Sequence, residues 1–262
     1  MIIDKGLGPS ATADLLPLAG EYIDHWKLSF GTAALMNEPL LCEKVAMLRE
    51  RDTLVYPGGT LTEFAIVQGV CQEYFQRAKA LGFNGVEISD GTIDLSAAVR
   101  RDAILRALDQ GLTVVSEVGK KDPRHQPTVE ALAAQAVADL ETGASWVIVE
   151  ARESGKGVGV FSDDGNVLAR DVDRLLAGLD GFGDRLIWEA PLKNQQEYFI
   201  LRCGSDVSLG NIQPSDVLAV EALRAGLRFE TLRPMVEKME REAPRSLSER
   251  LSRLALLKRP EA

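Results

Sequence analysis

The feature that most constrains the fold is a regular alternation of short apolar runs with amphipathic segments along the chain. Eight runs rich in valine and isoleucine have the length and composition of buried β-strands. They span residues 1–4, 22–31, 53–59, 85–91, 112–121, 145–157, 185–191 and 205–212. Segments with helical spacing of apolar residues separate them, most clearly at 71–83, 99–112 and 128–144. The repeat is roughly 30 residues long, which is the size of a βα unit.

Eight such repeats predict an α/β fold, a (β/α)8 TIM barrel, over residues 1–229. An open doubly wound sheet is the alternative, and it is disfavoured because no G-x-G-x-x-G follows the first predicted strand. Local signals agree with the predicted helices. Thr128 is placed as an N-cap, and Gly82, Gly111 and Gly143 each follow a helix as a C-cap glycine does.

Residues 230–262 are predicted to form a short helical C-terminal extension. Pro234 and Pro244 are expected to divide it into two charged helices, and Ser246 with Glu249 fits a capping box. Four leucines then form an i, i+4, i+7, i+10 stripe: Leu247, Leu251, Leu254 and Leu257. The stripe fits packing on the chain's own barrel or a contact between copies, and we expect a homo-oligomer.

Charge and composition exclude several classes of protein. The net charge of −9 and the pI of about 4.9 argue against non-specific nucleic-acid binding, which needs a basic surface. We expect no membrane span, because no stretch reaches about 18 apolar residues. The 3 cysteines form no CxxC pair, and the N-terminus does not resemble a signal peptide. These features predict a cytoplasmic protein with reduced thiols.

Four glutamates stand at corresponding places near the ends of predicted strands. They are Glu87, Glu117, Glu150 and Glu189. Strand side chains alternate between faces, so one parity places all four in the barrel lumen and sends apolar neighbours such as Val86 and Ile88 outward. The opposite parity would bury the charges under helices at several kcal/mol each. In a barrel, the lumen at the carboxyl ends of the strands is where active sites lie.

Four carboxylates in one mouth require cations. Oxygen ligands with few histidines in the chain suit a hard ion, and we predict Mg²⁺ held by these glutamates. Further candidates stand at other strand ends, as cations or as polar contacts for a small anion: Lys5, Lys27, Tyr56, Ser89, Lys120, Lys121, Arg152, Lys156 and Asn211. A site with metal-binding and basic sides suits a molecule that carries both a phosphate and a carboxylate. His25 shares a face with Lys27 and is interpreted as a structural interior histidine.

The segment EARESGKGVG, residues 150–159, superficially resembles a nucleotide-binding P-loop. That motif requires glycine five positions before Gly155 and Ser or Thr after Lys156, and the chain has Glu150 and Gly157 there. The segment is better interpreted as a glycine-rich loop whose N–H groups, together with Arg152 and Lys156, face an anion.

Several ordered blocks of the chain resemble the phosphosulfolactate synthase family. The most specific are VEISDG (86–91), EVGKK (117–121), ARESGKG (151–157) and EAPLKNQQ (189–196). The resemblance covers about residues 1–229 and implies a barrel lyase that forms a carbon–sulfur bond by adding sulfite to phosphoenolpyruvate, with Mg²⁺. The product, (2R)-phospho-3-sulfolactate, belongs to sulfonate biosynthesis and could feed coenzyme M or sulfolactate.

On this hypothesis, Lys121 or Lys120 delivers the proton, with Lys27 as a further catalytic candidate. Lys5, Tyr56, Ser89, Arg152, Lys156 and Asn211 are the substrate-binding candidates. Two alternatives stay open: another enolate-type lyase or aldolase on the same barrel, and a non-catalytic, stress-related homologue.

Overall fold

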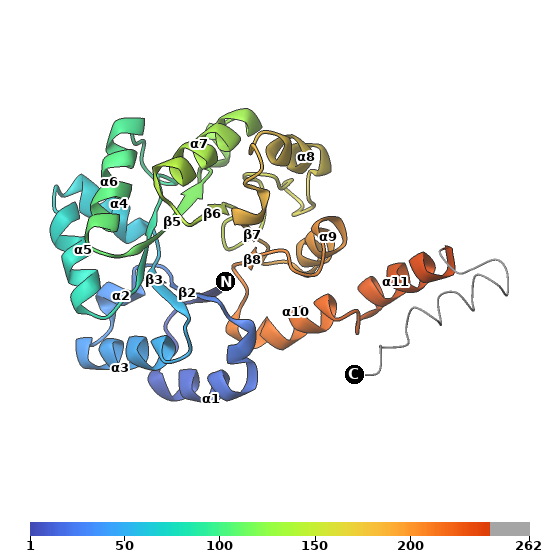
Figure 1. The fold of residues 1–262 in the computed structure, drawn as a ribbon, viewed down its shortest axis with the longest axis horizontal. Helices are drawn as coiled ribbons and strands as arrows, with labels where there is room; N and C mark the ends of the chain where they lie inside the picture. The colour runs from blue at the N-terminus through green and yellow to red at the C-terminus, as the bar shows by residue number, and fades with distance from the viewer. Residues whose placement is uncertain (242–262) are drawn as a thin grey trace, which may run out of the picture.

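The computed structural model describes residues 1–241, in which eight short parallel strands form a core surrounded by helices (Figure 1). The strands are β1 (Ile2–Asp4), β2 (His25–Leu28), β3 (Leu54–Pro57), β4 (Gly85–Ile88), β5 (Thr113–Val118), β6 (Trp146–Val149), β7 (Leu186–Glu189) and β8 (Leu209–Gly210). Each strand lies inside one of the eight predicted runs and is shorter than that run. The run 145–157 is the largest difference: β6 stops at Val149 because a loop with left-handed backbone follows, including Arg152 at φ 60° and Gly155 at φ 66°.

The strands form a ring with two hydrogen-bonded arcs, β1-β2-β3 and β4-β5-β6-β7-β8. The β8–β1 joint is closed by main chain, where Ile3 N–H donates to the carbonyl of Ile212 at 3.0 Å. At the β3–β4 joint a side chain replaces the ladder: Asn84 Oδ1 accepts from Val55 N–H at 2.7 Å, and its Nδ2 donates to the Thr53 carbonyl at 3.1 Å. The predicted barrel is therefore confirmed, and the open sheet is wrong.

Helices cover the outside of this ring on all sides in Figure 1. They are α1 (Pro9–Ala19), α2 (Thr32–Leu35), α3 (Glu38–Arg49), α4 (Thr60–Val67), α5 (Cys71–Ala80), α6 (Ala97–Asp109), α7 (Val129–Thr142), α8 (Ala169–Ala177), α9 (Lys193–Cys203), α10 (Val217–Arg224) and α11 (Phe229–Arg241). Short 3₁₀ turns occur at Gly20–Tyr22, Pro123–His125, Gly183–Arg185 and Pro214–Asp216. The three helices predicted most clearly correspond to α5, α6 and α7. Thr128 caps α7 as predicted, accepting from Ala131 N–H at 3.2 Å, and Gly143 ends it with φ 122°.

Two apolar layers show that the predicted parity is correct. Outward-facing residues such as Val86, Ile88 and Trp188 are buried against the helices. A smaller inner layer plugs the lumen and consists of Tyr56, Val115, Ile148 and Ile187. The four glutamates share the lumen with this layer and are each at most 2% exposed. Strand alternation therefore supplies both the core and the buried charges of the site.

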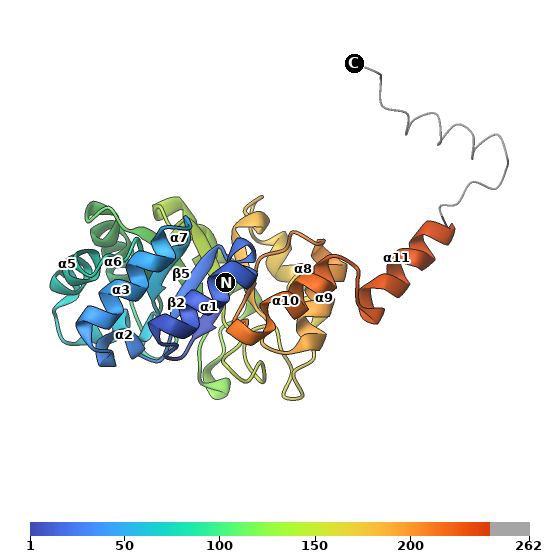
Figure 2. The same ribbon diagram turned by 90° about the horizontal axis from the view of Figure 1, so that it is seen from below.

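Beyond the barrel, α11 extends away from the body of the molecule (Figure 2). It continues through Pro234, so the predicted break at that residue is wrong. Pro234 has no N–H, so one helical hydrogen bond is missing and one carbonyl lacks its donor. Because Pro234 is exposed, water can hydrogen-bond to that carbonyl instead. The predictions for Pro244, the capping box and the leucine stripe lie outside the described residues. The domain boundary at 229/230, which falls at the start of α11, stays a prediction. Within residues 1–241, no helix is long and apolar enough to cross a membrane.

Candidate active site

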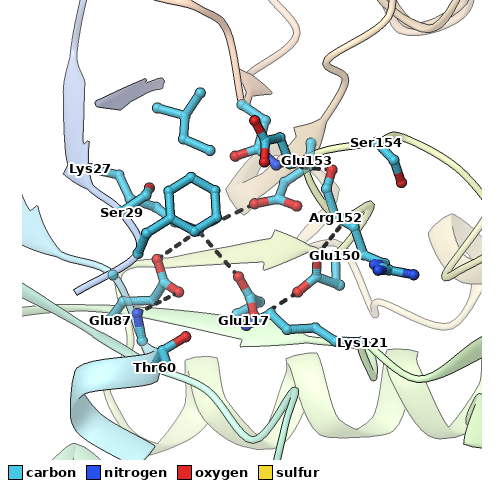
Figure 3. A pocket seen from close by; sticks show the side chains of 16 residues that line it. Lys27, Ser29, Thr60, Glu87, Glu117, Lys121, Glu150, Arg152, Glu153 and Ser154 are labelled. Atoms are coloured by element: carbon cyan, nitrogen blue, oxygen red, sulfur yellow. Dashed lines mark hydrogen bonds and ion pairs between the residues drawn. The ribbon is translucent and has the colours of Figure 1, made fainter. Parts of the chain in front are cut away.

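A cavity of about 350 Å³ opens at the carboxyl ends of the strands, where the barrel fold predicts an active site. Figure 3 shows its charged walls, which come from strand ends far apart in the sequence. Its lining includes eight of the predicted site residues: Lys27, Glu87, Glu117, Lys121, Glu150, Arg152, Glu189 and Asn211. The volume suits a small molecule of a few carbon atoms with one or two charged groups.

Lys27, on β2, lies among three of the four glutamates. Its Nζ is 2.9 Å from Glu87 Oε2, 3.2 Å from Glu117 Oε2 and 3.2 Å from Glu189 Oε1. Burial lowers the pKa of Lys27, but the three carboxylates outweigh it and hold that pKa well above its ordinary value. Lys27 is therefore a permanent buried cation that neutralises part of the carboxylate cluster.

Backbone N–H groups occupy further carboxylate oxygens. Glu87 Oε1 accepts from Gly59 N–H at 2.9 Å, Glu189 Oε2 accepts from Ala151 N–H at 3.0 Å, and Glu150 Oε1 accepts from Arg152 N–H at 2.5 Å. Both oxygens of Glu189 are thus in use, by Lys27 and by Ala151. These contacts fix the carboxylates without help from a ligand.

On the other side of the cluster, one oxygen of Glu117 and one of Glu150 lie beside Lys121. Glu117 Oε1 and Glu150 Oε2 are buried and, like Glu87 Oε2 beside Lys27, make no hydrogen bond. Lys121 Nζ lies 3.4 Å from Glu117 Oε1 and 3.6 Å from Glu150 Oε2, and its side chain is 34% exposed. Lys121 is therefore more accessible to a ligand than Lys27, whose side chain is 8% exposed.

The charges in the pocket do not balance by themselves. Four carboxylates face Lys27, Lys121 and Arg152. Burial, and then the charges of Glu117 and Glu189, raise the pKa of Glu150 well above its ordinary value. Burial opposes ionisation of Glu117 as well, but Lys121 and Lys27 outweigh it and lower that pKa. Glu117 in turn raises the pKa of Lys121. The lumen therefore favours the protonated form of Glu150 unless a further cation binds beside it.

Glu87 gives the cluster a pH-dependent stability. Burial raises its pKa to about 7, against the opposing effect of Lys27. Because the folded-state pKa is above the unfolded value, this group stabilises the fold fully below pH 4.5, and that stabilisation is lost as the pH rises through 7. Between pH 5 and pH 8, Glu87 should lower the free energy of unfolding of the native protein by up to about 3 kcal/mol. We expect Glu87→Gln to abolish this fall. Urea unfolding in EDTA measures it; an unchanged pH slope would contradict the assignment.

Gly59 allows the close approach between the β3 end and Glu87. A Cβ at Gly59 would lie 2.7 Å from both Glu87 Oε1 and Ser89 Oγ, whereas one at Gly58 would meet nothing nearer than the Leu28 carbonyl at 3.4 Å. We expect Gly59→Ala to destabilise the protein by about 1–3 kcal/mol through this overlap. Gly58→Ala is the matched control and should cost much less. Denaturant unfolding compares the two, and equal losses would refute the explanation.

Behind the pocket, Arg100 on α6 supports the end of β5. It is 1% exposed, and its Nη2 donates to the Glu117 carbonyl at 2.7 Å. It also pairs with Asp139 at 2.6 Å and with Asp90 at 2.9 Å. Sequence reasoning missed Arg100, because nothing in a helix marks a long-range contact. Its buried ion pairs fix the backbone from which Glu117 projects.

Other predicted site residues lie outside the pocket lining. Lys120 turns away: its Nζ donates to the carbonyls of Asp90 and Ile93 at 2.7 and 2.8 Å. Tyr56 belongs to the plug, with its hydroxyl donating to Met1 Sδ at 2.8 Å. Ser89 Oγ donates to Glu63 Oε1 at 2.7 Å.

The remaining two candidates lie at the surface. Lys5 pairs with Glu153 at the rim of the pocket, and Lys156 is exposed on the loop after β6. Neither lines the cavity. The β6 loop thus contributes Arg152, but not Lys156, to the pocket wall. His25 is an interior residue as interpreted, with its ring edge-on to Tyr56 and Trp146, and burial lowers its pKa to about 3.

Some lining residues were not among the predicted site residues. They are Ser29, Phe30, Thr60, Glu153 and Ser154, together with the backbone of Gly58 and Gly59. Ser29 could have been found, since it follows Lys27 by two residues and shares its parity. Phe30 could not, because its position depends on a left-handed turn at φ 56°.

The described residues contain no group of three or more histidine, cysteine or acidic side chains arranged to hold a metal ion as they stand. In the glutamate cluster, Lys27 occupies the centre that such an ion would take. The free oxygens of Glu117 and Glu150 nevertheless fit Mg²⁺, which commonly binds one or two carboxylates and completes its shell with substrate oxygens and water.

A closed parallel barrel with a charged pocket at the carboxyl ends of its strands defines a (β/α)8-barrel enzyme. A family model, described as ComA, (2R)-phospho-3-sulfolactate synthase, matches residues 1–230. The chain therefore belongs to the phosphosulfolactate synthase family, as its motifs predicted.

Individual relatives agree. The chain is 44% identical to the phosphosulfolactate synthase of Methanothermobacter thermautotrophicus over 88% of this chain and 90% of the relative. It is 42% identical to that of Methanocaldococcus jannaschii over 88% and 92%. A solved type I 3-dehydroquinate dehydratase from Clostridium difficile, at 12% identity, shares only the fold, with a TM-score of 0.50 over 86% of this chain and 91% of that one.

Proposed function

We propose that this enzyme adds sulfite to phosphoenolpyruvate to give (2R)-phospho-3-sulfolactate, with Mg²⁺. The observation that carries the proposal is the position of Lys121 beside buried oxygens of Glu117 and Glu150, inside a charged cavity of about 350 Å³. Membership of the family supports the same reaction.

In this reaction the sulfur lone pair forms a bond to C3 of the substrate. The electron pair of the C2–C3 double bond moves toward the carboxylate, and a proton then adds to C2. Nothing is oxidised or reduced, and no group leaves. The enzyme must therefore hold two anions together, stabilise charge on the carboxylate and supply one proton.

Of the four predicted metal ligands, we propose Glu117 and Glu150 as the ones that contact Mg²⁺. Glu87 and Glu189 are held by Lys27 and by backbone N–H groups. When bound, the ion would offset the negative charge that builds on the substrate carboxylate. Glu150 would have to lose its proton to serve as a ligand, so binding should release a proton.

We propose Lys121, rather than Lys120, as the residue that protonates C2. Lys121 is a cation at neutral pH, lines the cavity and is accessible to a ligand, whereas Lys120 is engaged with main-chain carbonyls outside it. Gly91 leaves space for the Lys121 side chain, since a Cβ there would lie 3.2 Å from Nζ.

The anionic groups need donors at the rim. Arg152, whose guanidinium can bind a phosphate or sulfite bidentately, is exposed and lines the pocket. Asn211, the residue after β8, joins it: its amide donates to the Arg152 carbonyl at 3.3 Å, and its Oδ1 makes no hydrogen bond. Lys5 and Lys156 remain candidates only for attraction of substrate from the rim.

Incubation with phosphoenolpyruvate, sulfite and Mg²⁺, followed by mass detection of the adduct, tests the proposal directly. We expect an adduct only when both substrates are present. Consumption of phosphoenolpyruvate without sulfite would favour another enolate-type lyase or aldolase. No turnover and no thermal shift with either ligand would favour a non-catalytic homologue. A cytoplasmic location, a homo-oligomer and the use of the product in coenzyme M or sulfolactate formation stay predictions.

A further inference from the structure

Ser29 presents a buried polar atom without a partner in the cavity. It follows β2, is 3% exposed, and its Oγ makes no hydrogen bond. Its backbone is fixed at both ends: its N–H donates to the Asp4 carbonyl at 2.9 Å, and its carbonyl accepts from Thr32 N–H at 3.1 Å. Figure 3 shows Ser29 on the wall beside Lys27. A buried hydroxyl in such a place is costly unless water or a ligand oxygen engages it, so it offers a ligand a hydrogen-bond partner.

The next residue, Phe30, is unusual in both exposure and backbone. Its side chain is 55% exposed although it lines the cavity. Its φ of 56° is left-handed, a conformation that is unfavourable for a bulky residue and continues into Gly31 at φ 68°. Such strain tends to persist at functional sites, where it holds a side chain in a required position. Among the lining side chains, only Phe30 and Ile3 are large and apolar.

We propose that Ser29 and Phe30 form one wall of the substrate site, in which Ser29 binds the substrate and Phe30 selects it by its carbon skeleton. Ser29 Oγ hydrogen-bonds an oxygen of the enol phosphate, and the Phe30 ring packs on its methylene end and limits substituents at C3. This inference rests on the proposed function. The ionic residues of the pocket recognise charge, which any phosphorylated enol acid carries. Discrimination by chain length therefore needs an apolar surface, and Phe30 supplies it.

The test compares phosphoenolpyruvate with phosphoenolbutyrate, which has a methyl group on C3. We expect the native enzyme to prefer phosphoenolpyruvate by roughly 10- to 200-fold in kcat/KM, the range for one methylene-sized difference. Phe30→Ala should reduce that preference at least tenfold, with Phe30→Leu between them. Phe64→Ala is the matched control, since Phe64 is 62% exposed on α4 and does not line the cavity. Equal preference in Phe30→Ala and the native enzyme would overturn the proposal.

Two further variants separate this role from a structural one. Ser29→Ala should raise KM for both substrates and leave the preference unchanged. Phe30→Gly should raise Tm, because glycine relieves the left-handed strain, while kcat/KM for phosphoenolpyruvate falls. A fall in Tm in Phe30→Gly would identify a structural role and contradict the proposal.

The proposed function can fail separately. If the native enzyme forms no adduct, thermal shifts with phosphoenolpyruvate and Mg²⁺ test the wall alone. A shift that Ser29→Ala and Phe30→Ala diminish, and that Phe64→Ala retains, would support the wall on an enzyme of different chemistry. No shift in the native protein would overturn both proposals.

Discussion

Replacing Lys121 with alanine is expected to lower kcat by about 10²–10⁴-fold, the usual contribution of a positioned proton donor. The side chain is partly exposed and makes two ion pairs, with Glu117 and Glu150, at 3.4 and 3.6 Å. Its removal should therefore leave the fold intact, which circular dichroism and Tm verify. Steady-state kinetics with phosphoenolpyruvate and sulfite measure the loss.

Lys120→Ala is a matched control, since the two lysines are adjacent but only Lys121 lines the cavity. Lys120 pairs with Asp90 at 3.1 Å and with Asp94 at 3.0 Å, so its loss should affect turnover by less than about tenfold. Equal losses in the two variants would show that the loop needs general positive charge rather than a proton from Lys121. Near-normal turnover in Lys121→Ala would refute its role outright.

Replacing Lys27 with methionine is expected to destabilise the fold by about 3–5 kcal/mol at neutral pH. The side chains of Glu87, Glu117 and Glu189 are at most 2% exposed and would lose their shared cation. Without it the folded-state pKa of Glu87, already raised by burial, rises further. Stability is then lost as the pH rises through that value, so the defect should be smaller at pH 5 than at pH 8. Urea unfolding at the two pH values, in EDTA, measures the difference.

Two controls accompany the Lys27 experiment. Lys79→Met removes an exposed lysine that donates to the Gly111 carbonyl and should change stability by less than about 0.5 kcal/mol. Combining Lys27→Met with Glu87→Gln should recover part of the lost stability, because one repelling carboxylate is gone. A defect that is independent of pH, and that Glu87→Gln does not lessen, would show that Lys27 matters only by its packing.

Much of this arrangement could be predicted from the sequence because strand alternation is a local property. The lumen contains the four predicted glutamates, Glu87, Glu117, Glu150 and Glu189. With the opposite parity, their apolar neighbours would face the lumen and the glutamates would be buried under helices. The same reasoning reached Lys27 and could have reached Ser29. Family motifs predicted the family, and the matching family model confirms it.

Other candidate residues lie outside the pocket lining because position at a strand end does not fix the direction of a side chain. Lys120 and Lys121 are equivalent in the sequence, yet Gly91 and the carbonyls of Asp90 and Ile93 separate their roles. Tyr56 has the correct parity but points into the plug. Ser89 is captured by Glu63, and no local pattern announces that contact.

The eightfold repeat, the inward face of each strand and the family could be predicted from the sequence, because they depend on periodicities and motifs within single segments. Which charges meet depends on how the strands close into a ring. Lys27 and Glu189 are 162 residues apart in the chain, and closure of the ring brings them to 3.2 Å. Closure of the ring therefore divides the four glutamates into two pairs. Glu87 and Glu189 are held at both oxygens, by Lys27 and by backbone N–H groups. Glu117 and Glu150 each keep one oxygen without a hydrogen bond, beside Lys121. The stretch EARESGKGVG contributes one of the second pair, Glu150, together with the arginine at the rim.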